Sequence, residues 1–165
     1  MPTYYATLDW TYPEGERTPL GFEVAAYLSS GGSPNVPLAL RQKTFNGRVV
    51  DVSVSLNNLP QGTYNSVPMS GGYGANCVCS VVVNSSGVIT SVTINEGGDL
   101  YRVGDELVGS VTVQSVEKQF YLQVTQVGFK VVYTTESSSP IKMAVRTVFS
   151  NGKSDWVESS TLTPA

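Results

Sequence analysis

A glycine-punctuated stretch with two-residue alternation, residues 62–107, constrains the fold of this chain more than any other feature. Within it, Cys77–Asn84 and Val88–Asn95 alternate largely apolar with polar positions, and the tripeptide Ser85-Ser86-Gly87 separates them. A period of two is typical of a half-buried strand, and a short loop that ends in glycine allows the positive φ that a tight reversal needs. The sequence therefore predicts a β-hairpin built for geometry rather than for reactivity.

Strand-like patterns continue through almost the whole chain. No window repeats apolar residues at i, i+3, i+4 and i+7, and 16 glycines and 9 prolines leave little room for a long helix. We therefore expect an all-β protein. Besides the hairpin, the expected strands are Ala6–Trp10, Phe22–Leu28, Val36–Arg41, Val49–Leu56, Val111–Val116, Phe120–Val124, Phe129–Thr134 and Lys142–Phe149.

Length and composition suit one domain, or one domain with an inserted unit, in a chain of 165 residues. Charged residues make up only 14% of the chain, against the usual quarter or so. The surface must therefore rely on Ser, Thr, Asn, Gln and Gly, which suits dense packing against neighbouring proteins.

Charge and hydropathy exclude two classes of partner. The formal net charge is −3 and no two Lys or Arg residues are adjacent, so the basic footprint of a nucleic-acid-binding protein is missing. No stretch approaches 18 apolar residues, and the start of the chain lacks a basic region followed by an apolar one. We expect a protein that is made soluble in the cytoplasm and does not span a membrane, with neither nucleic acid nor membrane as a partner.

The two cysteines, Cys77 and Cys79, lie two residues apart in an expected strand. Their Cα atoms would be roughly 6 to 7 Å apart on one face, at or beyond the limit for a disulfide. A metal site would need further soft or imidazole ligands, but the chain has no histidine and no other cysteine. We expect two reduced thiols on a buried face beside Val81 and Val83.

Catalytic constellations are hard to assemble without histidine, the side chain best suited to acid–base work near neutral pH. The carboxylate groups Glu14/Glu16 and Asp99/Asp105/Glu106 lie in turn-rich segments that we expect to be solvated. As an alternative, Asp99, Asp105 and Glu106 could bind Ca²⁺, although they do not show the alternating Asp/Asn spacing of a calcium-binding loop. We predict no enzyme activity, no cofactor and no metal site.

The segment Ser70-Gly71-Gly72-Tyr73-Gly74 superficially resembles a phosphate-binding loop. It lacks the GK[ST] ending, and no helix is expected after it to offer an N-terminal dipole. A β-turn or bulge is the expected structure.

The glycine series extends on both sides of the hairpin. Its residues are Gly62, Tyr64, Val67, Pro68, Gly71, Gly72 and Gly74, then Gly87 to Ile94, then Gly97, Gly98, Tyr101, Val103, Gly104, Asp105 and Leu107. This ordered series resembles a glycine-rich β-module of tailed-bacteriophage structural proteins. The resemblance implies a virion component, synthesised in the host cytoplasm, rather than an enzyme.

The two ends of the chain resemble a fibronectin type III domain, a β-sandwich of the immunoglobulin kind. Trp10, Pro13, Phe22 and Val24 occupy positions like those of its early strands. The segment 141–164 resembles its last two strands, with the hairpin turn expected at Asn151-Gly152. In addition, 56–64 resembles the approach to that fold's tyrosine corner, with Tyr64 as the corner residue.

Together the two resemblances imply a fibronectin-like sandwich, residues 1–61 plus 128–165, interrupted between its fifth and sixth strands by the glycine-rich module, residues 62–127. A first strand is missing before Tyr4, and Ile141 stands where the fold often keeps a tyrosine. The sandwich would then be truncated or completed by a neighbouring chain, because an unpaired strand edge invites such completion.

Aromatic residues supply the candidate contact surface. Tyr4 and Tyr5 near a terminus and Tyr73 in a loop are expected to be exposed, whereas Trp10 and Phe22 are expected in the core. Trp156 follows Asp155 near the last strand, either as a cap on the sandwich or as an interface residue. The candidate interface residues are therefore Tyr4, Tyr5, Tyr73 and Trp156.

The expected function is that of a non-enzymatic bacteriophage virion protein in a tail, baseplate, fibre or capsid decoration. Its expected partners are other virion proteins and copies of itself, because virion proteins repeat around symmetry axes. The alternative is a carbohydrate-binding module for attachment to host-surface glycans, with the module's aromatic residues as the platform.

Overall fold

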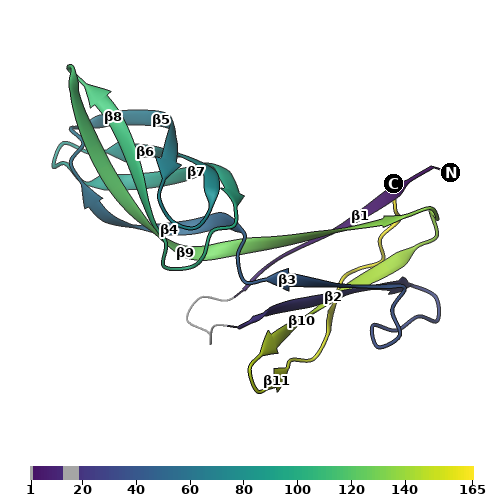
Figure 1. Cartoon of the computed structure of the whole chain (residues 1–165). Coiled ribbons are helices and arrows are strands. Elements are labelled where there is room, and N and C mark those ends of the chain that lie inside the picture. Colours follow the sequence, from purple (N-terminus) through teal and green to yellow (C-terminus); the bar gives the residue numbers. More distant parts are fainter. Residues whose placement is uncertain (1, 13–18) are drawn as a thin grey trace. The chain divides into compact units, whose positions relative to one another are not determined.

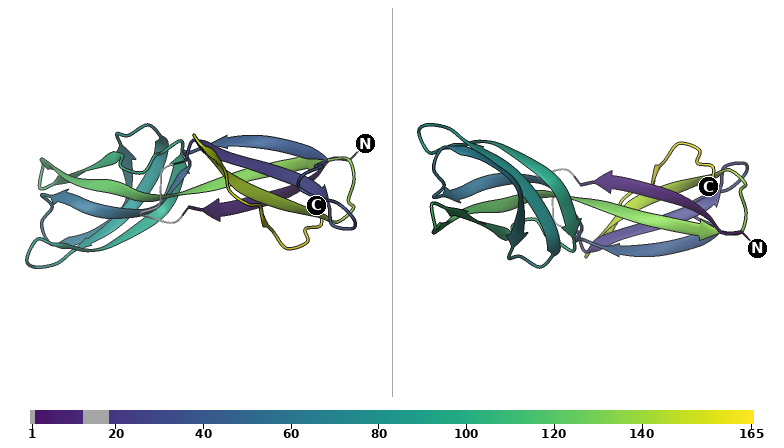
Figure 2. Two further views of the ribbon diagram at one scale, coloured as in Figure 1. Left: turned by 90° about the horizontal axis from the view of Figure 1, so that it is seen from below. Right: turned by 90° about the horizontal axis from the view of Figure 1, so that it is seen from above.

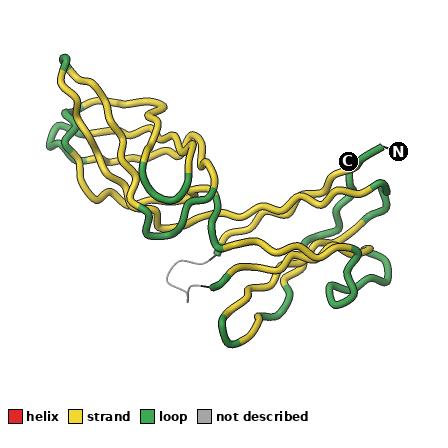
Figure 3. The backbone as a smooth tube through the Cα atoms, viewed as in Figure 1, coloured by secondary structure: helices red, strands yellow, loops and turns green. Residues whose placement is uncertain are grey.

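A computed structural model describes residues 2–12 and 19–165, in which all regular structure is β-strand (Figure 3). The all-β prediction is thereby confirmed. The strands are β1 (Tyr4–Thr11), β2 (Gly21–Leu28), β3 (Ala39–Thr44), β4 (Arg48–Asn57), β5 (Gly62–Ser70), β6 (Ala75–Val83), β7 (Ile89–Asp99), β8 (Glu106–Val113), β9 (Val116–Thr135), β10 (Ile141–Phe149), β11 (Gly152–Lys153) and β12 (Val157–Glu158).

The chain divides into two compact units. The first takes its described residues from Met1–Trp10, Glu16–Phe45 and Phe129–Ala165, and the second from Thr11–Gly15 and Asn46–Gly128. Strand β4, which the sequence analysis grouped with residues 1–61, pairs with β9 inside the second unit, from Arg48↔Gly128 to Asn57↔Phe120. The assignment of residues 62–127 as an inserted module stays a prediction.

The first unit is a β-sandwich. One layer has the order β11-β10-β2-β3, with β12 also paired to β10, and the other layer contains β1 beside the end of β9 (Figures 1 and 2). Buried Ala6, Val24, Ala26, Ile141 and Met143 form the core between the layers. Since Ala6 and Met143 lie about 140 residues apart in the sequence, both ends of the chain contribute to one hydrophobic core, as predicted.

Aromatic side chains fill the core of the first unit next to the aliphatic cluster. The ring of Phe129 lies 5.7 Å from Trp10, 4.6 Å from Phe22 and 5.4 Å from Phe45, measured between centroids. Phe22 is buried, as expected, and so is Phe129, whereas Trp10, which was also expected in the core, is half-buried. Ring pairs at these separations add to the stabilisation that burial itself provides.

The second unit is barrel-like. Strands β4, β9, β8, β5, β6 and β7 follow one another through antiparallel pairs, and β7 packs back against β4. That approach needs Gly97, because a Cβ there would lie 2.7 Å from the carbonyl oxygen of Val49. The buried hydrophobic side chains of this unit are Val49, Leu59, Val67, Met69, Cys77, Cys79, Val81, Val83, Tyr101, Leu107, Phe120, Leu122, Val124 and Val127.

The central hairpin is confirmed as β6 and β7, paired from Ala75↔Asp99 to Val83↔Ile89. The Asn84 side chain accepts hydrogen bonds from the amides of Ser86 and Val88 and so fixes the turn. Gly87 has a φ of +76°, the positive value that was predicted for the glycine at the end of this loop. The segment after β5 likewise turns at Gly71 and Gly72, both with positive φ, as expected.

Three expectations at the ends of strands need correction or completion. The segments Phe120–Val124 and Phe129–Thr134, which were expected as separate strands, belong to one continuous strand, β9. Gly128 lies within it and leaves room for the Arg48 side chain, since a Cβ there would lie 2.7 Å from Arg48 Cζ. The last hairpin pairs Phe149 with Gly152, so its loop is Ser150-Asn151 and not Asn151-Gly152. The Tyr64 hydroxyl donates to the carbonyl of Pro60 at 2.8 Å, a tyrosine-corner contact that lies in the second unit.

Cys77 and Cys79 are almost fully buried, and their Sγ atoms lie 3.7 Å apart. The predicted buried face, shared with Val81 and Val83, is confirmed. The hydrogen bond from Cys77 and burial together raise the pKa of the Cys79 thiol, which keeps it in its unreactive form.

We expect both cysteines to react slowly with a thiol reagent in the native protein and rapidly in denaturant, because only the exposed thiolate attacks the reagent. Labelling with Ellman's reagent at neutral pH, with and without urea, measures this directly. Rapid labelling of both thiols in buffer would show that the barrel interior is open to solvent.

Candidate functional site

The outer face of the β2–β10 sheet carries the most developed polar arrangement in the first unit. Glu23 pairs across the sheet with Arg146 of β10 and with Gln42 of β3. Directly opposed residues share one face, so these three side chains lie on the side away from the core residue Val24. Glu23 and Arg146 are 123 residues apart in the sequence and meet only because β2 pairs with β10.

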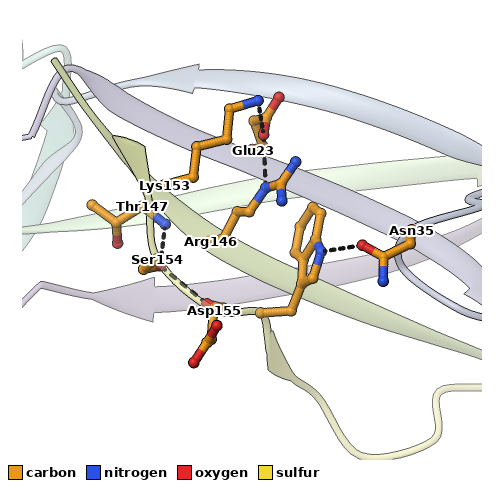
Figure 4. A network of polar contacts seen from close by, with 8 residues as sticks. Glu23, Asn35, Arg146, Thr147, Lys153, Ser154 and Asp155 are labelled. Atoms are coloured by element: carbon orange, nitrogen blue, oxygen red, sulfur yellow. Dashed lines mark hydrogen bonds and ion pairs between the residues drawn. The ribbon is translucent and has the colours of Figure 1, made fainter. Parts of the chain in front are cut away.

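Glu23 contacts both positively charged side chains of this arrangement. Its Oε1 accepts from Arg146 Nε at 2.8 Å and lies 3.0 Å from Lys153 Nζ, and its side chain is 8% exposed (Figure 4). Burial alone would raise the pKa of Glu23, but the hydrogen bonds from Lys153 and Arg146 outweigh it and hold the pKa below its ordinary value. The Glu23 carboxylate therefore remains charged at neutral pH although it is almost fully buried.

We expect Glu23→Gln to lower the free energy of unfolding by about 1.5–3 kcal/mol at neutral pH, the usual contribution of hydrogen bonds to charged groups. Since the folded pKa is depressed, the stabilisation is full above the unfolded glutamate value of about 4.3 and is lost as the pH falls through the folded pKa. Urea titrations from pH 7 to pH 2 of the parent, Glu23→Gln and the exposed control Glu136→Gln measure this. Equal acid dependence in all three proteins would contradict the role of Glu23.

Trp156 covers part of the same outer face. Its ring centroid lies 4.3 Å from Cζ of Arg146, and its Nε1 donates to Asn35 Oδ1 at 3.2 Å. The preceding residues are fixed as well, because Thr147 N donates to Ser154 Oγ at 2.8 Å (Figure 4). Trp156 is therefore half-buried against the sheet, and its role as an interface residue stays a prediction.

An exposed apolar strip follows β3 and the residues leading into it. Val36, Leu38 and Leu40 are 81%, 57% and 47% exposed. Leu40 pairs with Ala25 and Leu38 N donates to Ala26 O, so the strip continues the sheet on its outer face. Strand β3 ends the order β11-β10-β2-β3 and is therefore an edge strand. We call Val36, Leu38 and Leu40 the β3 strip.

The four predicted interface residues are divided between the two units: Tyr73 belongs to the second unit, and Tyr4, Tyr5 and Trp156 belong to the first. Tyr5 is 53% exposed, and its backbone exchanges two hydrogen bonds with Ala165, whereas Tyr4 is half-buried. Tyr73 is 69% exposed, but Cζ of Arg102 lies 4.1 Å from its ring centroid. One face of this ring is therefore already covered.

The expectation that Asp105 is solvated is wrong. Asp105 is buried, and its Oδ2 accepts from Tyr73 N at 3.0 Å and from Arg102 N at 2.9 Å. Gly72 leaves the necessary space, since a Cβ there would lie 2.9 Å from that oxygen. Asp105 therefore fixes two turns of the second unit, and Asp99 and Glu106 remain exposed.

The network around Glu23 and the exposure of the β3 strip were not predicted from the sequence. A detectable signal existed for the network, because Glu23 is the charged residue of the expected strand Phe22–Leu28 and Arg146 lies in the middle of the largely apolar expected strand Lys142–Phe149. Pairing those strands would have placed the charges opposite each other. The carboxylates Glu14 and Glu16 lie outside the described residues.

Across residues 2–12 and 19–165, no group of three or more Cys, Asp or Glu side chains is arranged to hold a metal ion. A helix with the length and apolarity needed to cross a bilayer does not occur in this described part either. No protein-family model matches the chain, and comparisons with curated proteins and with solved structures find no significant match.

Proposed function

We propose that this protein is a non-enzymatic structural component of a bacteriophage particle, in a tail, baseplate, fibre or capsid decoration, and that it acts through protein–protein contacts. The observation that carries the proposal is the β3 strip, three exposed apolar side chains along an edge strand and the residues that lead into it. The proposed localisation is the virion. The proposed partners are other virion proteins and further copies of this chain.

The β3 strip combines two features of a contact surface. An edge strand offers unpaired backbone N–H and C=O groups to another strand, and exposed alternate side chains add apolar area beside them. Proteins normally blunt such an edge with charge, proline or a covering loop. Arg41, Lys43 and Pro37 supply part of this protection here, but Leu38 and Leu40 are exposed between them, and this apolar area favours an edge that is covered in an assembly.

The glycine-rich series supports the phage assignment as a resemblance, and the structure gives these residues architectural roles. Gly97 permits the contact of β7 with β4, Tyr101 accepts a hydrogen bond from Cys77 N, and Asp105 holds two turns. These roles are those of a rigid building block. Rigid β-units suit repeated positions in a symmetric particle.

We expect the double variant Leu38→Glu/Leu40→Glu to reduce incorporation into particles at least about tenfold, because each buried leucine contributes roughly 1.5–3 kcal/mol to a contact. The test follows a tagged copy through density-gradient purification of phage particles, with quantitative immunoblotting of each fraction. Val116→Glu, which changes an exposed valine in the second unit, is the matched control. Circular dichroism of the isolated variants establishes that they are folded.

Two results would contradict the proposal. Parent protein that never sediments with particles would exclude a virion component. Undiminished incorporation of the folded double variant would show that the β3 strip makes no contact, and the contact model would then fail.

A further inference from the structure

A recess lies on the outer face of the first unit, beside the Glu23 network. Its volume is about 270 Å³, and it is lined by Glu23, Gln42, Thr44, Val148 and Lys153, with Leu20, Gly21, Phe22 and Lys43 completing the wall. Thr44 and Val148 both pair with Gly21, and Val148 pairs with Lys153. The recess is thus built from neighbouring positions on four strands or strand ends.

Gly21 creates the recess. Its two cross-strand partners carry side chains, but Gly21 has none, so the sheet surface is bare at this position. A side chain is also excluded there, because a Cβ would lie 2.5 Å from the carbonyl oxygen of Lys43. Backbone therefore forms the surface at Gly21, and residues with side chains, among them Gln42, Thr44 and Lys153, line the recess around it.

The charges around the recess favour an anion. Glu23 contributes one negative charge, and Arg146 and Lys153 on its Oε1 contribute two positive ones. The Lys153 ammonium has three N–H donors, and one of them is directed at Glu23. Because the side chain is 46% exposed, the other donors can bind a ligand. The buried carboxylate holds this ammonium in place before a ligand arrives, which reduces the entropy cost of binding.

The neutral lining narrows the class of anion. Gln42 contributes an amide, Thr44 a hydroxyl, and Leu20 and Val148 an apolar wall. A sugar ring presents hydroxyl groups and a C–H face together, and it matches such a mixed lining better than a simple inorganic ion. The volume lies just below the range of about 300–1,000 Å³ for sites that take drug-sized ligands, so one sugar residue is the appropriate size.

From these observations we infer that the recess binds a single acidic sugar residue, a hexuronate unit, with its carboxylate on Lys153 and its hydroxyls on Gln42. This site goes beyond the proposed structural function. It lies beside the β3 strip, and neither role requires the other.

The test is a ¹H–¹⁵N NMR titration of the full chain with methyl β-glucuronide. We expect saturable shifts confined to the amides of residues 20–23, 42–44, 148 and 153. Methyl β-glucoside is the uncharged analogue that lacks the carboxylate. It is expected to bind at least about tenfold more weakly, because it loses one charge-assisted hydrogen bond. N-acetylglutamate amide supplies a carboxylate without a sugar, and sodium sulfate reports an adventitious ion.

Three variants test whether the glucuronide binds in this recess. Lys153→Met is expected to weaken glucuronide binding about tenfold. Gln42→Glu, at an exposed rim position opposite Glu23, places a second negative charge beside the ligand and should weaken glucuronide binding by a similar factor. Lys130→Met removes a charge from an exposed site outside the recess and should leave the affinity unchanged.

The inference is overturned if glucoside and glucuronide bind equally, or if N-acetylglutamate amide or sulfate competes as well as the glucuronide. It is also overturned if no saturable shift occurs, or if folded Gln42→Glu binds like the parent. A failure here leaves particle incorporation unaffected, so it is distinguishable from a failure of the proposed function.

Discussion

Phe129→Ala is expected to lower the free energy of unfolding of the first unit by about 3–5 kcal/mol, the cost of removing a fully buried phenylalanine. Phe129 has no exposed surface, and its ring contacts those of Trp10, Phe22 and Phe45. Both tryptophans of the chain, Trp10 and Trp156, belong to this unit. Tryptophan fluorescence in a urea titration therefore reports its unfolding specifically.

The matched control is Val132→Ala, three residues farther along β9 at a position that is 43% exposed. We expect a loss below about 1 kcal/mol there, because little apolar area is removed from contact. A loss below about 1 kcal/mol for Phe129→Ala as well would mean that the aromatic cluster does not hold the two layers together.

Asp105→Ala is expected to destabilise the second unit by about 3–5 kcal/mol, because the amides of Tyr73 and Arg102 lose a charged acceptor and that acceptor supplies about 1.5–3 kcal/mol to each. The exposure of Cys77 and Cys79 to a thiol reagent in increasing urea measures unfolding of this unit, since both thiols lie in its interior.

Asp99→Ala provides the comparison for Asp105. Asp99 is exposed, and its Oδ1 accepts from its neighbour Leu100 N at 2.8 Å. We expect a change below about 1 kcal/mol, as for most exposed substitutions. If both alanine variants unfold at the same urea concentration, Asp105 is an ordinary loop residue and the structural role assigned to it is wrong.

Local features of the fold could be predicted from the sequence. The β6–β7 hairpin was predictable because the alternation of its strands and the glycine at its turn lie within about 20 consecutive residues. The burial of Cys77 and Cys79 followed from the same period of two. The membership of both chain ends in one sandwich was predictable only through the fibronectin-like pattern at each end.

Features that depend on distant pairing could not be predicted in this way. Glu23 meets Arg146 only because β2 pairs with β10, and no local pattern specifies that register. Asp105 appeared solvated because its segment is rich in turns, but the Tyr73 amide that it binds is 32 residues away. The exposure of the β3 strip depends in turn on which strand ends the sheet.

Electron cryomicroscopy of purified phage particles tests the proposed structural role most directly. The account predicts density into which the two β-units fit, at a symmetric position in the tail, baseplate, fibre or capsid, with Val36, Leu38 and Leu40 against a neighbouring chain. Particles that lack such density, in preparations from cells in which the protein is abundant, would contradict the account.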